Sequence, residues 1–149
     1  MMGPVDLRAV IAEVVDLQDP VAEGAGIRLI DACREVPHAH GDAAKLKQAL
    51  VNLIVNSIEA MVGAGGGTIS VAAERAESGF VELRVEDTGP GLPDSAKDPV
   101  KPFVTTKPAG TGLGLTIVSK IAELHGGRME MGPREGGGTI VRLVLPAHA

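Results

Sequence analysis

The sequence has no tryptophan or tyrosine, only two phenylalanines, and a single cysteine, Cys33. A chain so poor in aromatic rings lacks the stacking platforms on which single-stranded nucleic acids are usually bound. One cysteine excludes an internal disulfide and suits a reducing compartment, so we expect a cytoplasmic protein.

Apolar runs long enough to cross a bilayer are also absent, as is the basic-then-apolar layout of a secretory signal. Basic residues are in the minority, because 14 Lys and Arg face 19 Asp and Glu, a net charge of −5. This balance argues against DNA or RNA as the main partner, and we expect no membrane contact. A hydrophobic content of 44% over 149 residues is typical of one globular domain, here residues 1–149.

Hydrophobic periodicity predicts an α/β fold, with helices packed on one face of a mixed sheet. The predicted helices are 5–19, with Asp6 as cap and an end near Pro20 or just beyond, 42–61 behind the cap Asp42, and 113–125. The predicted strands are 27–33, 68–75, 81–86, 128–131 and 139–145. Between them, 88–112 is rich in Gly, Pro and Thr, which predicts a long functional loop.

Three alternating glycines, Gly110, Gly112 and Gly114, run into the predicted helix 113–125. Glycines at a helix N-terminus let backbone N–H groups approach a ligand, and the helix dipole there favours negative charge. The pattern therefore predicts a phosphate site and a nucleotide ligand. It is not a P-loop, because no Lys-Ser or Lys-Thr closes it, and no strand precedes it as in a dinucleotide fingerprint. Taken alone, the run is also compatible with a flexible linker before an ordinary helix.

Two asparagines lie in the middle of the predicted helix 42–61. The core stripe of this helix is Leu46, Leu50, Leu53, Ser57 and Met61. Asn52 and Asn56 lie four residues apart, so both side chains point the same way, beside that stripe. Asparagine is a poor helix former, and an amide oxygen is a hard neutral ligand suited to Mg²⁺ that substrate phosphates complete. The alternative is a pair of solvent-facing polar side chains.

An aspartate ends the predicted strand 81–86 and begins the turn Asp87-Thr88-Gly89-Pro90-Gly91. A carboxylate there can accept a hydrogen bond from an exocyclic amine, which would select adenine. Gly89 and Gly91 would let the backbone pass close to a flat base. By itself this is also a common turn sequence.

Together these motifs closely resemble the ATP-binding catalytic domain of two-component sensor histidine kinases. That domain belongs to the GHKL superfamily of gyrase, chaperone, kinase and mismatch-repair ATPases. Asn52–Ser57 resembles the N box of that family, and Asp87–Gly91 resembles its first glycine box. Pro102–Lys107 resembles the F box, and Gly110–Leu115 resembles the second glycine box. The four motifs stand in the family order and cover nearly the whole chain.

The resemblance implies the Bergerat fold, a two-layer α/β sandwich in which three helices back a mixed sheet and a mobile lid at about 93–110 covers ATP. Asn56 would coordinate Mg²⁺, and Asn52 would support the metal or the phosphates. Asp87 would read the adenine amino group with an ordered water and the hydroxyl of Thr139. The other implied nucleotide contacts are Gly89, Gly91, Thr105, Thr106, Lys107, Gly110, Thr111, Gly112, Leu113, Gly114 and Leu115. Phe103 would anchor the lid, contact the phosphoacceptor helix, or act as a simple hydrophobic plug.

The implied activity is transfer of the ATP γ-phosphate to a histidine on a separate dimerisation domain, with a response regulator downstream. None of the four histidines begins a helical His-Glu or His-Asp motif: they are His38, His40, His125 and His148. We therefore expect the phosphoacceptor and sensor domains to lie outside this chain, and the fragment to be monomeric. Two features depart from the family, because Lys101 replaces an acidic residue before Pro102 and the lid between Gly91 and Pro102 is short.

Three other functions stay open on the sequence. An ATP-hydrolysing relative carries a glutamate one turn before the metal asparagine, where this chain has Asn52, so negligible ATPase activity is predicted. A stand-alone serine protein kinase of the anti-sigma type would use the same motifs on a different acceptor. A docking or nucleotide-sensing module would bind without catalysis.

Overall fold

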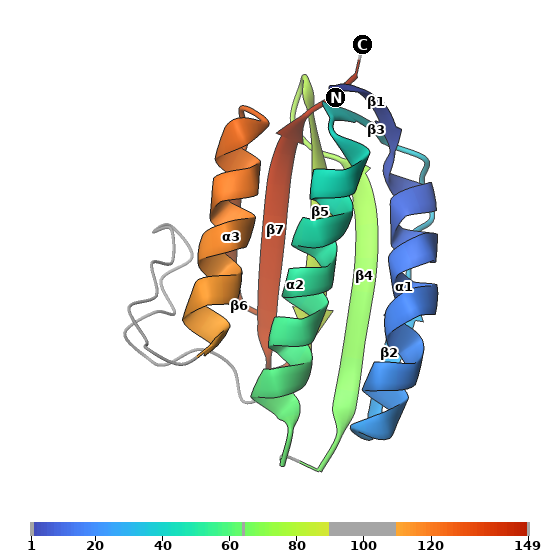
Figure 1. The fold of residues 1–149 in the computed structure, drawn as a ribbon, viewed down its shortest axis with the longest axis vertical. Helices are drawn as coiled ribbons and strands as arrows, with labels where there is room; N and C mark the ends of the chain where they lie inside the picture. The colour runs from blue at the N-terminus through green and yellow to red at the C-terminus, as the bar shows by residue number, and fades with distance from the viewer. Residues whose placement is uncertain (1, 64, 90–109, 149) are drawn as a thin grey trace.

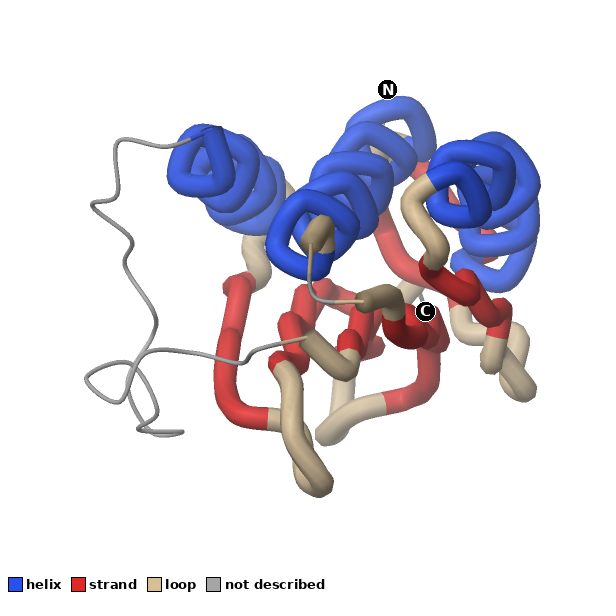
Figure 2. Tube along the Cα trace, turned by 90° about the horizontal axis from the view of Figure 1, so that it is seen from below, coloured by secondary structure: helices blue, strands red, loops and turns tan. Residues whose placement is uncertain are grey.

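Two layers make up the protein, a five-stranded sheet and a set of helices that covers one of its faces (Figures 1 and 2). The structure is a computed structural model, and it describes residues 2–63, 65–89 and 110–148. The helices within those residues are α1 (Leu7–Gly24), α2 (Ala43–Met61) and α3 (Gly110–Leu124). None of them is both long and apolar enough to span a bilayer.

The sheet is mixed, as predicted. Its strands run in the order β2 (Ile27–Asp31), β4 (Gly67–Arg75), β5 (Phe80–Asp87), β7 (Thr139–Pro146) and β6 (Arg128–Pro133). Only β2 and β4 pair in parallel, and the other neighbours are antiparallel. The predicted α/β sandwich with three helices on one face is therefore confirmed.

The core lies between the sheet and the helices. In β5 every second residue is buried, beginning with Val81, Leu83 and Val85. Asp87 continues this period of two, so the sheet geometry directs its side chain to the same buried face. On α2 the whole predicted core stripe is buried, including its one polar member, Ser57.

Both predicted caps are present. Asp6 Oδ1 accepts hydrogen bonds from the backbone N–H groups of Arg8 and Ala9. Asp42 Oδ1 does the same for Ala44 at 3.0 Å and Lys45 at 3.3 Å. These side chains satisfy N–H groups that have no partner within their own helices.

Some predicted helix ends are wrong. α1 starts at Leu7, and it continues through Pro20 to Gly24 although a proline removes a helical hydrogen bond. Ala22 is fully buried beyond the proline, and this packing holds the last turn. The helix ends before Gly26, whose φ is +76°. α3 begins at Gly110, earlier than predicted.

The structure also has a strand that was not predicted from the sequence, β3 (His38–Gly41). It pairs antiparallel with β1 (Gly3–Asp6), part of which was predicted as helix. Each strand has four residues, too few for a clear alternation to show in the sequence. β2 ends at Asp31 rather than residue 33, because Asp31 Oδ1 accepts the N–H of Cys33 in a local turn.

The face of the sheet away from the helices carries a charge network centred on Arg84. Its guanidinium contacts Glu74 at 2.6 Å, Glu82 at 3.1 Å and Glu86 at 3.5 Å. Burial acts to lower the pKa of Arg84, but the hydrogen bond to Glu74 and the three carboxylates together raise it above its ordinary value. Arg142 lies directly opposite Arg84 in the β5–β7 register, and Glu82 contacts both arginines, which offsets their repulsion.

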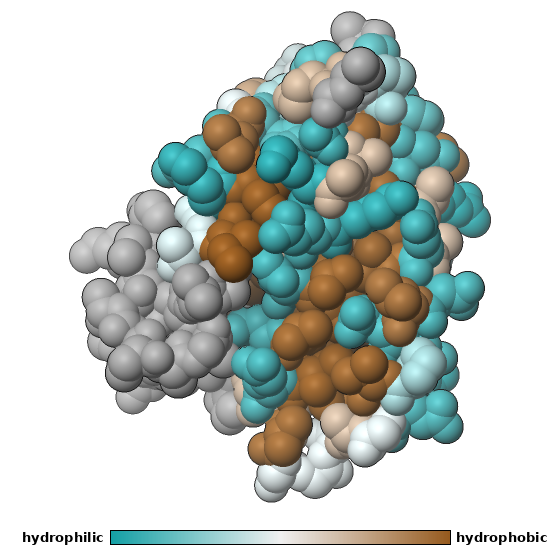
Figure 3. All heavy atoms as spheres, viewed as in Figure 1, coloured by the Kyte–Doolittle hydropathy of each residue, from teal (hydrophilic) through white to brown (hydrophobic). Residues whose placement is uncertain are grey.

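The outer surface of the helical layer exposes apolar side chains. Leu17 and Val21 on α1 and Val62 after α2 are more than half exposed. Figure 3 shows apolar side chains gathered over the lower halves of α1 and α2. Apolar patches of this kind are typical of surfaces that meet another protein.

Candidate functional site

The two asparagines of α2 sit beside the core stripe, both half-buried. Asn56 Oδ1 is buried, and it accepts no hydrogen bond from any residue that the structure describes. Leaving such an oxygen unsatisfied costs about 1–3 kcal/mol, so a bound ligand is the natural partner for it. A neutral amide oxygen fits Mg²⁺, which takes oxygen ligands. Gln48 and Glu59 on the same helix are exposed.

Asp87 closes β5, and only 7% of it is exposed. Its Oδ1 accepts a hydrogen bond from the N–H of Gly89 at 2.9 Å. Its second oxygen, Oδ2, bonds to none of the described residues. The site therefore holds a buried carboxylate with one oxygen engaged by the backbone, which leaves the other as the candidate acceptor for a ligand's N–H.

Thr139, the predicted helper of Asp87, begins β7 directly opposite it in the strand register. It is buried to the same degree, with 7% exposed. The preceding Gly138 has φ +106°, and a Cβ there would overlap the carbonyl oxygen of Asp87. Only glycine allows this close passage of the two strands. The sequence interpretation overlooked Gly138, although the run of three glycines before β7 was a signal for it.

The glycine run forms the first turns of α3, from Gly110 through Thr111, Gly112 and Leu113 to Gly114. A helix start directs N–H groups and a positive dipole end outward, which suits an anion. Leu115, the last predicted contact, is buried in the apolar core.

The remaining predicted residues are Gly91, Lys101, Pro102, Phe103, Thr105, Thr106 and Lys107. They lie outside the described residues, as does the predicted lid apart from Gly110.

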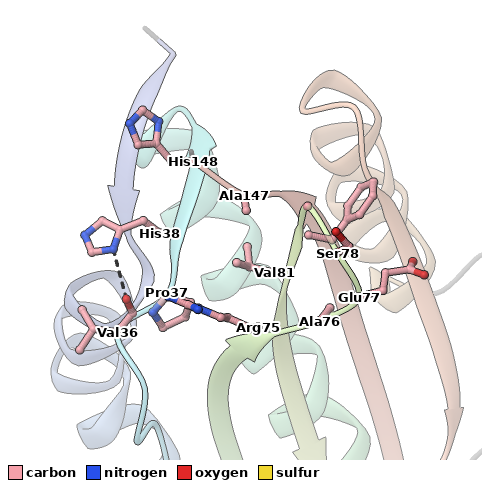
Figure 4. A pocket seen from close by; sticks show the side chains of 12 residues that line it. Val36, Pro37, His38, Arg75, Ala76, Glu77, Ser78, Val81, Ala147 and His148 are labelled. Carbon is pink, nitrogen blue, oxygen red and sulfur yellow. Dashed lines mark hydrogen bonds between the residues drawn. The ribbon is translucent and has the colours of Figure 1, made fainter.

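A cavity of about 390 Å³ lies at the other end of β5, beside Phe80 (Figure 4). Residues 36–38, 75–81 and 147–148 line it. His38 is one of the lining residues, and its Nδ1 lies 3.1 Å from the carbonyl oxygen of Val36 (Figure 4). None of the described site residues takes part in the lining, because β5 separates Phe80 from Asp87 by its full length. The cavity is thus separate from the candidate site.

The sequence profile of histidine kinase-, DNA gyrase B-, and HSP90-like ATPases matches residues 41–149. The chain belongs to this ATPase family. The matched residues include every described member of the candidate site. The resemblance inferred from the four motifs is therefore confirmed.

Curated relatives of this ATPase domain are sensor kinases. The C4-dicarboxylate transport sensor protein DctS of Rhodobacter capsulatus is 37% identical over 149 residues, which cover 97% of this chain and 22% of DctS. Sensor histidine kinase ZraS of Escherichia coli is 36% identical over 146 residues, covering 97% of this chain and 31% of ZraS. The ATPase domain thus spans less than a third of these two relatives.

Solved histidine kinase structures share this fold. The catalytic domain of histidine kinase ThkA superposes with a TM-score of 0.80 at 30% identity, covering 98% of this chain and 97% of that one. Full-length ShkA, in complex with AMPPNP, superposes with a TM-score of 0.81 at 30% identity over 99% of this chain and 31% of ShkA. The ATPase domain therefore has the fold of a histidine kinase catalytic domain.

Proposed function

We propose that this ATPase domain binds Mg-ATP and donates the γ-phosphate to a histidine on a separate phosphoacceptor domain of the same kinase. The observation that carries the proposal is the buried Asn56 Oδ1, which has no hydrogen-bond donor among the described residues and lies on a helix that packs against α3. Family membership and the AMPPNP-bound neighbour ShkA support the nucleotide assignment.

Each site residue has a binding or orienting role in this proposal. Asn56 holds Mg²⁺, which when bound neutralises phosphate charge, and Asn52 orients the metal or the phosphates. Asp87 and Thr139 bind the adenine edge, and Gly89 and Gly91 let the backbone pass it. The start of α3, Gly110–Leu115, binds the phosphates, with Thr105, Thr106 and Lys107 from the lid.

Phosphoryl transfer depends mainly on positioning and charge neutralisation. The acceptor imidazole is itself the nucleophile, so this domain needs no general base. Asn52 stands where a hydrolytic relative has a glutamate, and an amide cannot take a proton from water at neutral pH. We expect slow ATP hydrolysis by the isolated domain, and fast Mg²⁺-dependent phosphate release would contradict this.

The proposed partners are the dimerisation and phosphoacceptor domain and, downstream, a response regulator, all in the cytoplasm. The length of DctS and ZraS beyond the matched segment supports further domains in the parent protein. The exposed side chains of Leu17 and Val21 on α1 and of Val62 after α2 support contact with another domain.

The test is calorimetric titration with ATP, with and without Mg²⁺. Wild type is expected to bind ATP more tightly with Mg²⁺, and Asn56→Ala is expected to lose most of that Mg²⁺-dependent gain. Gln48→Ala, an exposed change on the same helix, is the matched control. An Asn56→Ala protein that keeps the full gain would overturn the metal assignment, and absent ATP binding in wild type would favour a docking module.

A second experiment decides the acceptor. Radiolabelled ATP is offered with a histidine-bearing helical hairpin or with a serine protein substrate. Label on the hairpin that is acid-labile, as phosphohistidine is, supports the proposal. Acid-stable label on serine alone would favour the serine kinase alternative.

A further inference from the structure

Thr88, between Asp87 and Gly89, ties the turn after β5 to the start of β4. Its Oγ1 accepts a hydrogen bond from the N–H of Thr68 at 3.0 Å. Its own N–H donates to the carbonyl oxygen of Thr68 at 3.1 Å. The β4–β5 pairing ends at Ile69 and Asp87. The two bonds between Thr68 and Thr88 therefore extend the link between these strands into the turn that follows Asp87.

Met61, the last residue of α2, packs against the same turn and is fully buried. A Cβ on Gly89 would come within 2.9 Å of Met61 Cγ and 3.1 Å of Asp87 Oδ1. A Cβ on Gly67 would overlap Met61 Cε and lie 2.8 Å from Thr88 Oγ1. The turn is therefore held from two sides, by the edge of β4 through Thr88 and by the end of α2 through Met61.

The orientation of the Asp87 carboxylate depends on this support. The Gly89 N–H engages Oδ1, and this bond sets which oxygen remains for a ligand. If Gly89 moves, the carboxylate loses the contact that fixes its rotation. The hydroxyl of Thr88 is the side-chain link between that segment and the rigid sheet.

We propose that Thr88 is a positioning residue for base selectivity, whose hydroxyl keeps Asp87 Oδ2 aimed at the exocyclic amine of adenine. This inference rests on the proposed function, because it assumes that Asp87 reads the base. Thr88 itself touches no reacting atom. Its effect is expected in the discrimination between bases rather than in phosphate or metal binding.

The experiment measures Kd for Mg-ADP and for Mg-IDP, whose base carries an oxo group in place of the amine. Wild type is expected to prefer ADP, and Thr88→Val is expected to lower the ADP-to-IDP preference about three- to tenfold, the range of one hydrogen bond. Thr88→Ser retains the hydroxyl and should restore the preference. Thr88 is exposed, so water can hydrate the freed Thr68 N–H and the valine variant is expected to fold, which a thermal melt checks.

A double-mutant cycle with Asp87→Asn separates positioning from general damage. If Thr88 acts through Asp87, the double variant discriminates no worse than Asp87→Asn alone. A Thr88→Val protein with the wild-type preference, or with equal losses for ADP and IDP, would overturn the inference while leaving the proposed function standing. If wild type binds neither nucleotide, the proposed function fails instead. If wild type binds both equally, the assignment of Asp87 as the base reader fails.

Discussion

His125 is expected to hold α2 and α3 together. Replacing it should therefore lower the free energy of unfolding by more than replacing an exposed histidine does. The ring follows the last residue of α3 and is 4% exposed. Its Nε2 lies 3.0 Å from the N–H of Asp42, the cap of α2, and its Nδ1 lies 2.8 Å from the carbonyl oxygen of Ile121. A backbone N–H can only donate, so Nε2 accepts, and Nδ1 carries the proton that is donated to Ile121.

His125→Ala removes the acceptor of a backbone N–H and leaves a void where the ring packed. An unsatisfied donor costs about 1–3 kcal/mol and lost core volume adds to it, so we expect a loss of roughly 2–4 kcal/mol. For a chain of this size each kcal/mol lowers Tm by about 2–4 °C, so Tm should fall by roughly 5–15 °C. Urea unfolding followed by circular dichroism measures the loss. His148→Ala is the matched control, because His148 is exposed and stacks only on His40 among the described rings.

A second substitution checks the packing. A Cβ on Gly41 would lie 2.6 Å from His125 Cδ2, so Gly41→Ala should destabilise the wild type by about 1–3 kcal/mol. In the His125→Ala background the new methyl enters vacated space, and its cost should shrink. The reasoning is refuted if His125→Ala behaves like His148→Ala, or if the two changes add without coupling.

Three further outcomes are expected. Asp87→Asn should weaken ATP more than GTP in calorimetry, and equal losses would count against Asp87 as the base reader. Gly138→Ala should lower the free energy of unfolding by about 2 kcal/mol or more, because its φ is +106° and a Cβ there overlaps the Asp87 carbonyl. Gly132→Ala, which meets nothing within 4 Å, is its control, and equal effects would refute the close-approach argument. Arg84→Met should cost about 1 kcal/mol in low salt, because Glu74, Glu82 and Glu86 lose the cation that they share, and among the described residues only Glu82 and Glu86 keep another, Arg142 and Arg134. Salt screens the resulting repulsion, so a loss that does not shrink in high salt would contradict this account.

Local patterns in the sequence determined much of this protein. Asp6 and Asp42 were recognisable as caps because a cap bonds only to the next turn of its own helix. The core stripe of α2 and the alternation of β5 follow from the helical and strand periods, which need no distant partner. The order of the four motifs was enough to indicate the ATPase family, which the comparisons confirm.

Only the tertiary structure decided the features that depend on residues far apart in the chain. Buried Ala22 holds α1 helical past Pro20, and β3 exists because β1 pairs with it. The contact of His125 with the cap of α2 and that of Thr88 with Thr68 each join separate elements. The sequence showed that Asn56 lies beside the core stripe, but whether its oxygen finds a donor depends on how α2 packs against its neighbours. Such contacts form only when the chain closes on itself, so they leave no periodic trace in the sequence.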